Sequence, residues 1–460
     1  MTPQEIVERA LALSRTRGCI VLVRSQSVAN LRWARTTLTT NGETLATAVT
    51  VVALADVPGG VGVGSVTASA PDAAGLEDLV RRAEAVAAAE RPAEDAAPLV
   101  DDRPASPDWD DPVQVATSAV FASLAPALGD TFGSAARDGI ELFGYAEQVV
   151  STVHLGTSSG LRLRHAEPEG RLEQTAKSHG RTRSSWAGRA GHDAGAFDVA
   201  ALDAELRQGL AWQERSVEVA PGRHTAVLTP SAVADLMIEL YWASVGRDAA
   251  DGSSVWSGAG GGTRVGQQVA DPRVTLRSDP HLPGFETLPF VATGTSSGAR
   301  SVFDDGLELG PTSWIADGVL THLVTSRHTA AETGLPVRPA IGNLALEVSG
   351  GSGSLADVVA RTDDGLLVTC LWYNRIVDAQ TLLLTGLTRD GVYRVRGGEV
   401  VGAVTNFRFN DSPVAVLGRV LDAGTPTGTL AREMADYFNR SLMPPLVVAD
   451  YNFSTVSQAS

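Results

Sequence analysis

Hydrophobic and polar positions follow helical and strand-like periods in the first half of the chain. Thr2-Pro-Gln-Glu5 matches a capping box with proline at the first helical position, and apolar residues then recur at helical spacing. The pattern therefore predicts a first helix from residue 2 that Gly18 ends. Further helices are expected over 75–90 and over 198–215, the last of which closes this half.

Runs of β-prone residues between these helices predict a mostly antiparallel sheet. Asn41-Gly42 separates two such runs, and this dipeptide is a strong hairpin signal. We therefore expect strands over 32–40 and 44–54 joined by a tight turn there. The other expected elements of this half are a helical segment over 113–124, strands over 20–23, 140–154, 160–165, 171–179 and 183–188, and turns at Gly156–Gly160, Glu167–Gly170 and Ser178–Gly180.

The second half is richer in β-prone runs and has fewer helical patterns. Thr229 and Pro230 suit the start of a helix over 229–248, and a helix is also expected over 429–440. Asp317-Gly318 and Gly397-Gly398 predict hairpin turns. The predicted fold class is therefore α+β. An N-terminal α+β domain over 1–220 precedes a β-rich C-terminal domain over 221–450.

Two segments are expected to lie outside these domains' regular structure. Residues 91–112 carry five prolines and many acidic residues, which is typical of an extended, solvated connection. The polar residues 451–460 are expected to form a frayed tail.

Composition narrows the classes of function. The chain has 460 residues, of which 43% are hydrophobic and 20% charged, as in ordinary globular proteins. Its net charge of −16 repels phosphate backbones, so nucleic acid is not an expected partner. No apolar run reaches the length that spans a bilayer, and no signal peptide is recognisable, so we expect a cytoplasmic protein that does not bind membranes. Cys19 and Cys370 each lie in an apolar run and are expected to be buried.

Common catalytic motifs are not supported by their context. Two Gly-Thr-Ser-Ser-Gly segments, at 156–160 and 294–298, match the nucleophile elbow, but neither leads from a strand into a predicted helix. No phosphate-binding loop occurs. None of the eight histidines pairs with another at four or five residues on a predicted helix, and no His-Glu dipeptide exists. These patterns alone identify no active site.

An ordered set of segments resembles the TldD/TldE (PmbA) family. The set comprises Val269–Gly284 with its Asp-Pro turns, Phe303–Gly306, Trp314–Ala330 with a Ser-Arg-His-Thr-Ala stretch, Gly342–Leu344, Asp364–Val368, Gly391–Val400 and Asn406–Asn410. The resemblance covers most of the chain and is looser before residue 130. No single segment is specific, but their order is.

The family has two branches, and the resemblance places this chain in the branch without a zinc motif. The TldD branch carries His-Glu-x-x-x-His on a helix that binds zinc together with a further ligand, and it acts as a metallopeptidase. Laid on the helix over 229–248, the motif puts Ile238 and Ala243 at the histidine positions and Glu239 at the glutamate position. Isoleucine and alanine have no lone pair for zinc. We therefore expect no metal and no cofactor in this chain, and Glu239 is only a weak catalytic candidate.

The resemblance implies a non-catalytic TldE-like subunit. Its partner would be a TldD-like chain that carries the zinc, and the heterodimer would cut or trim peptides or hydrolyse an amide during natural-product maturation. Four polar residues fall in matching segments and are candidates for substrate binding, although ordinary hydrogen bonding at strand ends explains each equally well: Arg327, His328, Asn406 and Arg408.

Three alternatives stay open at this point. The chain could be a homodimer that binds a peptide or small molecule without cleaving it. It could be a self-sufficient hydrolase with a relocated site. The family's older description as a modulator of DNA gyrase leaves a protein–protein effect open as well, although the acidic charge disfavours direct contact with DNA. The sequence does not identify the substrate.

Overall fold

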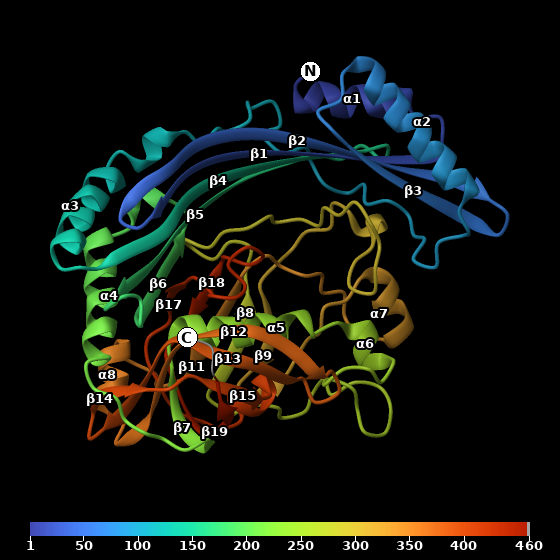
Figure 1. Ribbon diagram of the computed structural model, residues 1–460. Helices are drawn as coiled ribbons and strands as arrows, with labels where there is room; N and C mark the ends of the chain where they lie inside the picture. The colour runs from blue at the N-terminus through green and yellow to red at the C-terminus, as the bar shows by residue number, and fades with distance from the viewer. Residues whose placement is uncertain (458–460) are drawn as a thin grey trace.

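A long antiparallel sheet forms the N-terminal half and arches over a β-rich C-terminal half (Figure 1). The computed structural model describes residues 1–457 of the chain. The arrangement confirms the predicted α+β class, the antiparallel N-terminal sheet and the strand-rich C-terminal part. Both cysteines are buried and free, as their apolar surroundings predicted.

The N-terminal sheet has the strand order β3-β2-β1-β4-β5-β6. Its strands are β1 (Gly18–Ala34), β2 (Thr37–Val57), β3 (Gly60–Ser69), β4 (Glu141–Thr157), β5 (Arg162–Ser178) and β6 (Arg183–Gly191). The helices of this half all cover the convex face: α1 (Pro3–Leu13), α2 (Ala73–Ala89), α3 (Leu124–Arg137) and α4 (Val199–Trp212) (Figure 1). The concave face is thereby left to the C-terminal half.

The start of α1 confirms the predicted capping box. The Thr2 hydroxyl accepts the N–H of Glu5 at 3.2 Å, and the Glu5 carboxylate accepts the N–H of Thr2 at 2.8 Å. The helix ends at Leu13, five residues before Gly18. Gly18 does not end the helix as predicted, but is the first residue of β1.

The predicted hairpin at Asn41-Gly42 is wrong. The β1–β2 turn is formed by Arg35 and Thr36, whose φ angles of 51° and 60° give a tight two-residue turn. Asn41 and Gly42 instead lie inside β2. The register is set further along the strands, where alternating valines face the helices, and a buried alternating face outweighs a local turn signal.

The predicted turn at Glu167–Gly170 is also wrong, because β5 runs through it without a break. A side chain at Gly170 would overlap the main chain of Ala194, so this glycine permits a close approach and not a turn. The expected helix over 113–124 shrinks to a 3-10 turn, η1 (Ser118–Phe121), before α3 begins.

Residues 91–112 contain no helix or strand, as their composition predicted. They are not wholly solvated, however. Val100 is buried, and Trp109 packs edge-on against His154 of β4 with ring centroids 5.4 Å apart. Residues 91–112 therefore form an extended connection that packs against the N-terminal sheet.

The C-terminal half contains two more sheets. One has the order β10-β9-β8-β11-β18-β17, with strands β8 (Val274–Ser278), β9 (Thr312–Ala316), β10 (Val319–Leu320), β11 (Leu344–Val348), β17 (Thr427–Thr429) and β18 (Ser441–Met443). The other has the order β12-β7-β19-β15-β13-β14, with β16 beside β19. Its strands are β7 (Gly222–Leu228), β12 (Asp364–Asp378), β13 (Leu383–Arg396), β14 (Glu399–Val404), β15 (Phe407–Asp411), β16 (Val420–Ala423) and β19 (Leu446–Val456). Pairing of β12 with β13 closes the second sheet into a ring.

Short helices connect these strands: α5 (Pro230–Trp242), α6 (Gly246–Ala250), α7 (Arg327–Thr333), α8 (Leu355–Ala360) and α9 (Pro413–Leu417), with 3-10 turns η2 (Ala194–Ala196) and η3 (Val302–Asp304). The helix expected over 229–248 thus breaks after Trp242. Both predicted hairpin turns, Asp317-Gly318 and Gly397-Gly398, are confirmed. The boundary predicted near Ala220 lies between α4 and β7.

Two predictions near the C-terminus fail. The expected helix over 429–440 is absent, because Thr429 ends β17 and residues 430–440 form a loop, three of whose main-chain N–H groups bind a buried side chain. The expected frayed tail from residue 451 does not hold as far as Val456, because Tyr451 and Phe453 are fully buried in β19. Residues 458–460 lie outside the described residues.

The two halves share a hydrophobic core at one end of the arch. Phe290, Val302 and Phe303 of the C-terminal half pack against Ile20 and Leu22 on the concave face of the sheet. No helix in the described part of the chain is long and apolar enough to cross a membrane.

We predict that His154 makes stability fall with acidity. Its ring is fully buried, makes no hydrogen bond within residues 1–457, and lies near the ion pair of Arg164 with Asp108. Burial, with a smaller contribution from Arg164, lowers its pKa to about 4. Between the ordinary value near 6.5 and about 4, the unfolded chain binds a proton that the folded chain does not, so the free energy of unfolding falls as pH falls through that window.

The measurement is chemical denaturation of the wild type and His154→Phe from pH 7.5 to 4. Phenylalanine cannot take up a proton. Between pH 7.5 and 4 we therefore expect the free energy of unfolding to fall by up to about 3 kcal/mol less in the variant than in the wild type. Parallel curves for the two proteins would contradict this role for His154.

Candidate functional site

Helix α5 carries Ile238 and Ala243, the two positions on which the family resemblance lays the zinc histidines of the TldD branch. Thr229 caps the helix by accepting the N–H of Ala232, and Pro230 occupies its first position. Apolar residues surround the helix on nearly all sides, so its side chains pack into the largest core of the molecule. Ile238 is fully buried there, and Ala243 forms the C-terminal cap.

These side chains do not fit zinc. Ile238 and Ala243 have no donor atom, and zinc sites use sulfur, nitrogen or carboxylate oxygen ligands. Within residues 1–457, no group of three or more His, Cys, Asp or Glu side chains is arranged to hold a metal ion. No step of a reaction can therefore be assigned to a zinc ion bound by α5 of this chain.

Glu239 lies between these two positions and is only 9% exposed. Its carboxyl group accepts no hydrogen bond from the described part of the chain. Burial raises its pKa, repulsion from Glu433 raises it further, and Arg375 opposes the shift. Glu433 itself accepts the N–H of Tyr373 at 2.8 Å and an N–H of Arg375 at 3.3 Å. The carboxyl groups of Glu239 and Glu433 therefore lie near one another, and their repulsion adds to the effect of burial on the pKa of Glu239.

Asp235, one helical turn before Glu239, holds the loop over 430–440 in place. Its fully buried carboxylate accepts the main-chain N–H groups of Arg432, Glu433 and Met434 at 3.0–3.2 Å. Burial raises the pKa of Asp235, and these three hydrogen bonds oppose the shift. These three hydrogen bonds tie the loop to α5.

The same loop binds the concave face of the N-terminal sheet through charged side chains. Arg432 pairs with Glu173 of β5 at 2.8 Å, Arg171 pairs with Asp436 at 2.6 Å, and Arg440 pairs with Glu167 at 3.0 Å. The Arg432 guanidinium also lies between two indoles, 4.8 Å from the ring centroid of Trp186 and 5.0 Å from that of Trp372. The loop therefore links α5 to the arch.

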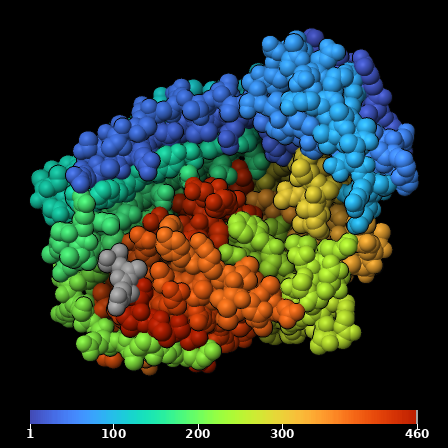
Figure 2. Space-filling view, turned by 45° about the vertical axis from the view of Figure 1, so that its right-hand side comes forward, coloured from blue at the N-terminus to red at the C-terminus, as the bar shows by residue number. Residues whose placement is uncertain are grey.

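The space beneath the arch is partly open. In the space-filling view a hollow separates the arch from the C-terminal half (Figure 2). A cavity of about 250 Å³ on the concave side is lined by Arg32, Tyr145, Glu173 and Arg432, among others. Polar and aromatic side chains thus line the concave wall.

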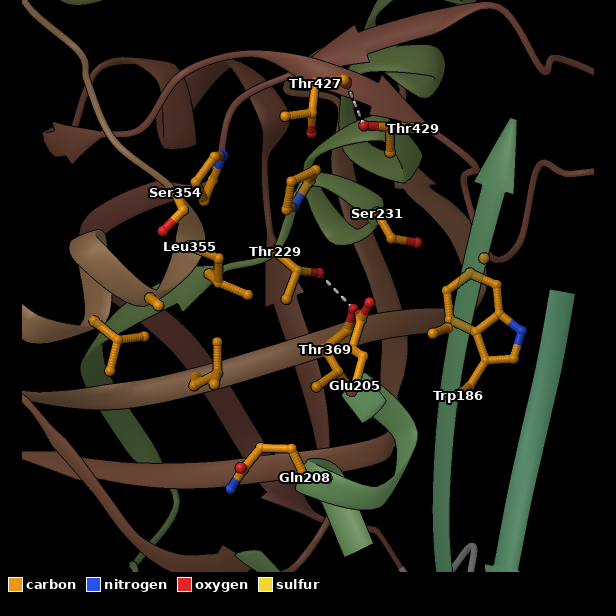
Figure 3. Close-up of a pocket in the computed structure, with 18 of the residues that line it drawn as sticks. Trp186, Glu205, Gln208, Thr229, Ser231, Ser354, Leu355, Thr369, Thr427 and Thr429 are labelled. Carbon is orange, nitrogen blue, oxygen red and sulfur yellow. Dashed lines mark hydrogen bonds between the residues drawn. The ribbon is translucent and has the colours of Figure 1, made fainter. Parts of the chain in front are cut away.

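A larger cavity, of about 830 Å³, lies between β6 and α4 on one side and the start of α5 and α8 on the other, and Leu430 of the loop lines it. Figure 3 shows Trp186, Gln208, Ser231 and Leu355 around it. The Thr229 hydroxyl donates to the main-chain oxygen of Thr369 at 2.5 Å between these residues. Most of the lining surface is apolar.

The structure does not bring the four predicted substrate-binding residues together. Arg327 begins α7 and donates to Asp304 at 2.7 Å and to the main-chain oxygen of Pro98, and His328 lies 3.4 Å from Glu332. The other two lie at β15: Asn406 accepts the hydroxyl of Thr388 at 3.2 Å, and Arg408 donates to Thr385 at 3.3 Å. None of the four lines either cavity.

Sequence reasoning missed the loop and the cavities. Arg432 and Glu433 were assigned to a helix, and nothing in their spacing indicates partners in distant elements. A local signal was Asp235, which with Glu239 is one of two acidic residues in a mostly apolar helix, because a buried carboxylate needs several donors.

We predict that removing the Asp235 carboxylate lowers the free energy of unfolding. Asp235→Ala leaves three buried N–H groups without a partner, so we expect a loss of about 3–5 kcal/mol in the free energy of unfolding. Asp436→Ala in the same loop is the matched control, because its side chain is 72% exposed and its ion pair contributes less than about 1 kcal/mol. Urea denaturation of both variants measures the difference, and equal losses would show that Asp235 does not anchor the loop.

Comparisons with known proteins agree with this architecture. Residues 221–455 match the sequence profile of the PmbA/TldA metallopeptidase C-terminal domain. The fold is similar to that of TldE from Thermococcus kodakarensis, with a TM-score of 0.79 at 14% identity over 98% of this chain and 99% of that chain. No curated protein matches the chain significantly by sequence.

Two further solved structures share the fold, and both are described as proposed modulators of DNA gyrase. The protein from Bacteroides thetaiotaomicron has a TM-score of 0.75 at 15% identity, over 99% of this chain and 98% of that chain. The protein from Thermotoga maritima has a TM-score of 0.74 at 15% identity, over 98% of this chain and 100% of that chain. With its profile match over more than half of its length, the chain belongs to the TldD/TldE (PmbA) family of metallopeptidase-related proteins.

Proposed function

We propose that this chain is the non-catalytic subunit of a two-chain zinc metallopeptidase that cuts or trims peptides. The observation that carries the proposal is the chemistry of α5. The two positions that bind zinc in the related branch hold Ile238 and Ala243, one packed in the core and the other at the helix end. A metallopeptidase built on this fold needs its zinc ligands from a second chain.

The partner in this proposal is a TldD-like chain with the His-Glu-x-x-x-His motif. That chain supplies the ion, which lowers the pKa of the attacking water, and the glutamate that receives the water's proton. The present chain supplies a rigid wall. Its loop over 430–440 is fixed both to α5 and to β5, so the concave face and the carboxyl groups of Glu239 and Glu433 keep their positions when a substrate enters.

Glu239 is assigned no part in activating water. No group of side chains around it within residues 1–457 is arranged to hold a metal ion, and without a bound ion there is no activated water from which Glu239 could take a proton. The peptide substrate follows from the family's metallopeptidase character and stays a proposal, as does amide hydrolysis in natural-product maturation.

A homodimeric binding protein is the second candidate function. The cavity of about 830 Å³ favours it, because this cavity is complete within one chain and its lining is mostly apolar. A role at DNA gyrase through direct contact with DNA is disfavoured by the net charge of −16.

The pair's peptidase activity tests the proposal. The chain is co-purified with the TldD-like relative from the same genome, and cleavage of a casein digest is followed by mass spectrometry. We expect Glu239→Gln in this chain to retain activity within about threefold. Replacing the motif glutamate of the relative should reduce the rate by at least about a hundredfold, since general-base catalysis contributes about that much or more.

Two outcomes contradict the proposal. One is loss of activity on Glu239→Gln comparable with that of the motif variant, which would give this chain a catalytic carboxylate. The other is cleavage by this chain alone, with zinc bound to it.

A further inference from the structure

The free edge of β6 borders the large cavity. Strand β6 is the last strand of the N-terminal sheet and pairs only with β5. Five consecutive residues of β6, Ser185 to Arg189, line the cavity of about 830 Å³. Side chains alternate between the two faces of a strand, so a consecutive run indicates that the edge of the strand, with its main chain, faces the cavity.

Hydrogen bonds at Ser184 show which main-chain groups point outward. The side-chain amide of Gln213 accepts the N–H of Ser184 at 3.1 Å and donates to its C=O at 2.7 Å. This amide takes the place of a neighbouring strand. Because the direction of main-chain groups repeats every second residue, the N–H and C=O groups of Trp186 and Gly188 point to the same free edge.

The geometry of β5 also indicates that the main-chain groups of Trp186 and Gly188 point outward. Glu173 lies across from Gly188 in the β5–β6 register, and its C=O lies close to Gly144 of β4. It therefore points away from β6, as expected where a pair of residues is not joined by hydrogen bonds. The edge groups of Trp186 and Gly188 are thus not used by β5.

The uncovered stretch of edge is short and has defined ends. Gln213 covers Ser184 at one end, and Gly428 of β17 approaches the C=O of Ala190 at the other. Between them the Gly188 C=O accepts the side chain of Arg189 at 2.9 Å. No hydrogen bond from the rest of residues 1–457 reaches the outward N–H and C=O of Trp186 or the N–H of Gly188. Three main-chain groups are left to face the cavity.

We propose that this cavity binds an extended peptide segment, which adds a short strand to the edge of β6. The unpaired main-chain groups of Trp186 and Gly188 would hold its main chain, and strand addition to an exposed edge is a known mode of peptide recognition. The apolar lining, including Leu355, Val359 and Val400, receives the side chains of the segment. The site lies wholly within this chain, so it goes beyond the proposed subunit role and does not depend on a partner.

Selectively N-methylated peptides test the main-chain pairing. The probe is the fluorescein-labelled peptide Lys-Thr-Val-Thr-Val-Thr-Lys, used with the purified full chain alone and read by fluorescence anisotropy. A first analogue is methylated at every second amide, which leaves one edge of the peptide able to pair. A second is methylated at all central amides, which leaves neither edge. Side chains are identical in all three.

We expect the first analogue to bind within about threefold of the probe and the second to bind at least about tenfold more weakly, because about three hydrogen bonds are lost. Equal binding of the two analogues would overturn the proposal in favour of a purely apolar pocket. Absence of binding by the unmethylated probe at millimolar concentration would overturn it as well.

A pair of variants on α8 locates the binding. Ala356 lines the cavity and is exposed, so Ala356→Trp fills the space without disturbing the core, and we expect the probe to bind at least about tenfold more weakly. Ala360 is exposed on the same helix and does not line the cavity, so Ala360→Trp is the matched control. Unchanged binding by Ala356→Trp would place the peptide elsewhere. The methylated peptides use the unaltered chain, so their result stands even if a variant fails to fold.

Discussion

The buried carboxylate of Asp235 accepts three main-chain N–H groups from the loop over 430–440, and much of the architecture depends on this contact. It fixes a loop whose side chains bind in opposite directions. Arg432 reaches the N-terminal sheet at Glu173, whereas Glu433 stays beside Glu239 of α5. The Asp235 carboxylate of α5 thereby couples the core of the C-terminal half to the arch.

That coupling fixes one side of the concave wall. In this fold α5 is embedded in the core on nearly all sides, so its conformation does not require an ion. The position of Glu239 keeps a carboxyl group near the wall and beside Glu433, and burial together with that neighbour raises its pKa. The wall and the β6 edge are separate features, because Trp186 turns its ring to Arg432 and its main chain to the cavity.

Local patterns predicted the fold class, both C-terminal hairpin turns and the cap of α1, because each depends on residues close in sequence. They failed where distant contacts decide the structure. The register of β1 and β2 overrides the Asn41-Gly42 turn, and residues 430–440 form a loop held by distant contacts with Asp235 and Glu173. The candidate site was only partly predictable for the same reason. The positions on α5 followed from the family resemblance, whereas the cavities assemble residues that are hundreds of positions apart.

Native mass spectrometry of this chain co-expressed with its His-Glu-x-x-x-His relative tests the central claim most directly. The account predicts a complex of one copy of each chain with one zinc ion, and it predicts that zinc is lost when the relative's two motif histidines are replaced. Substituting Glu239 in this chain should leave both the complex and its zinc intact. A homodimer of this chain that forms unchanged in the presence of the relative would contradict the account, as would zinc bound to this chain alone.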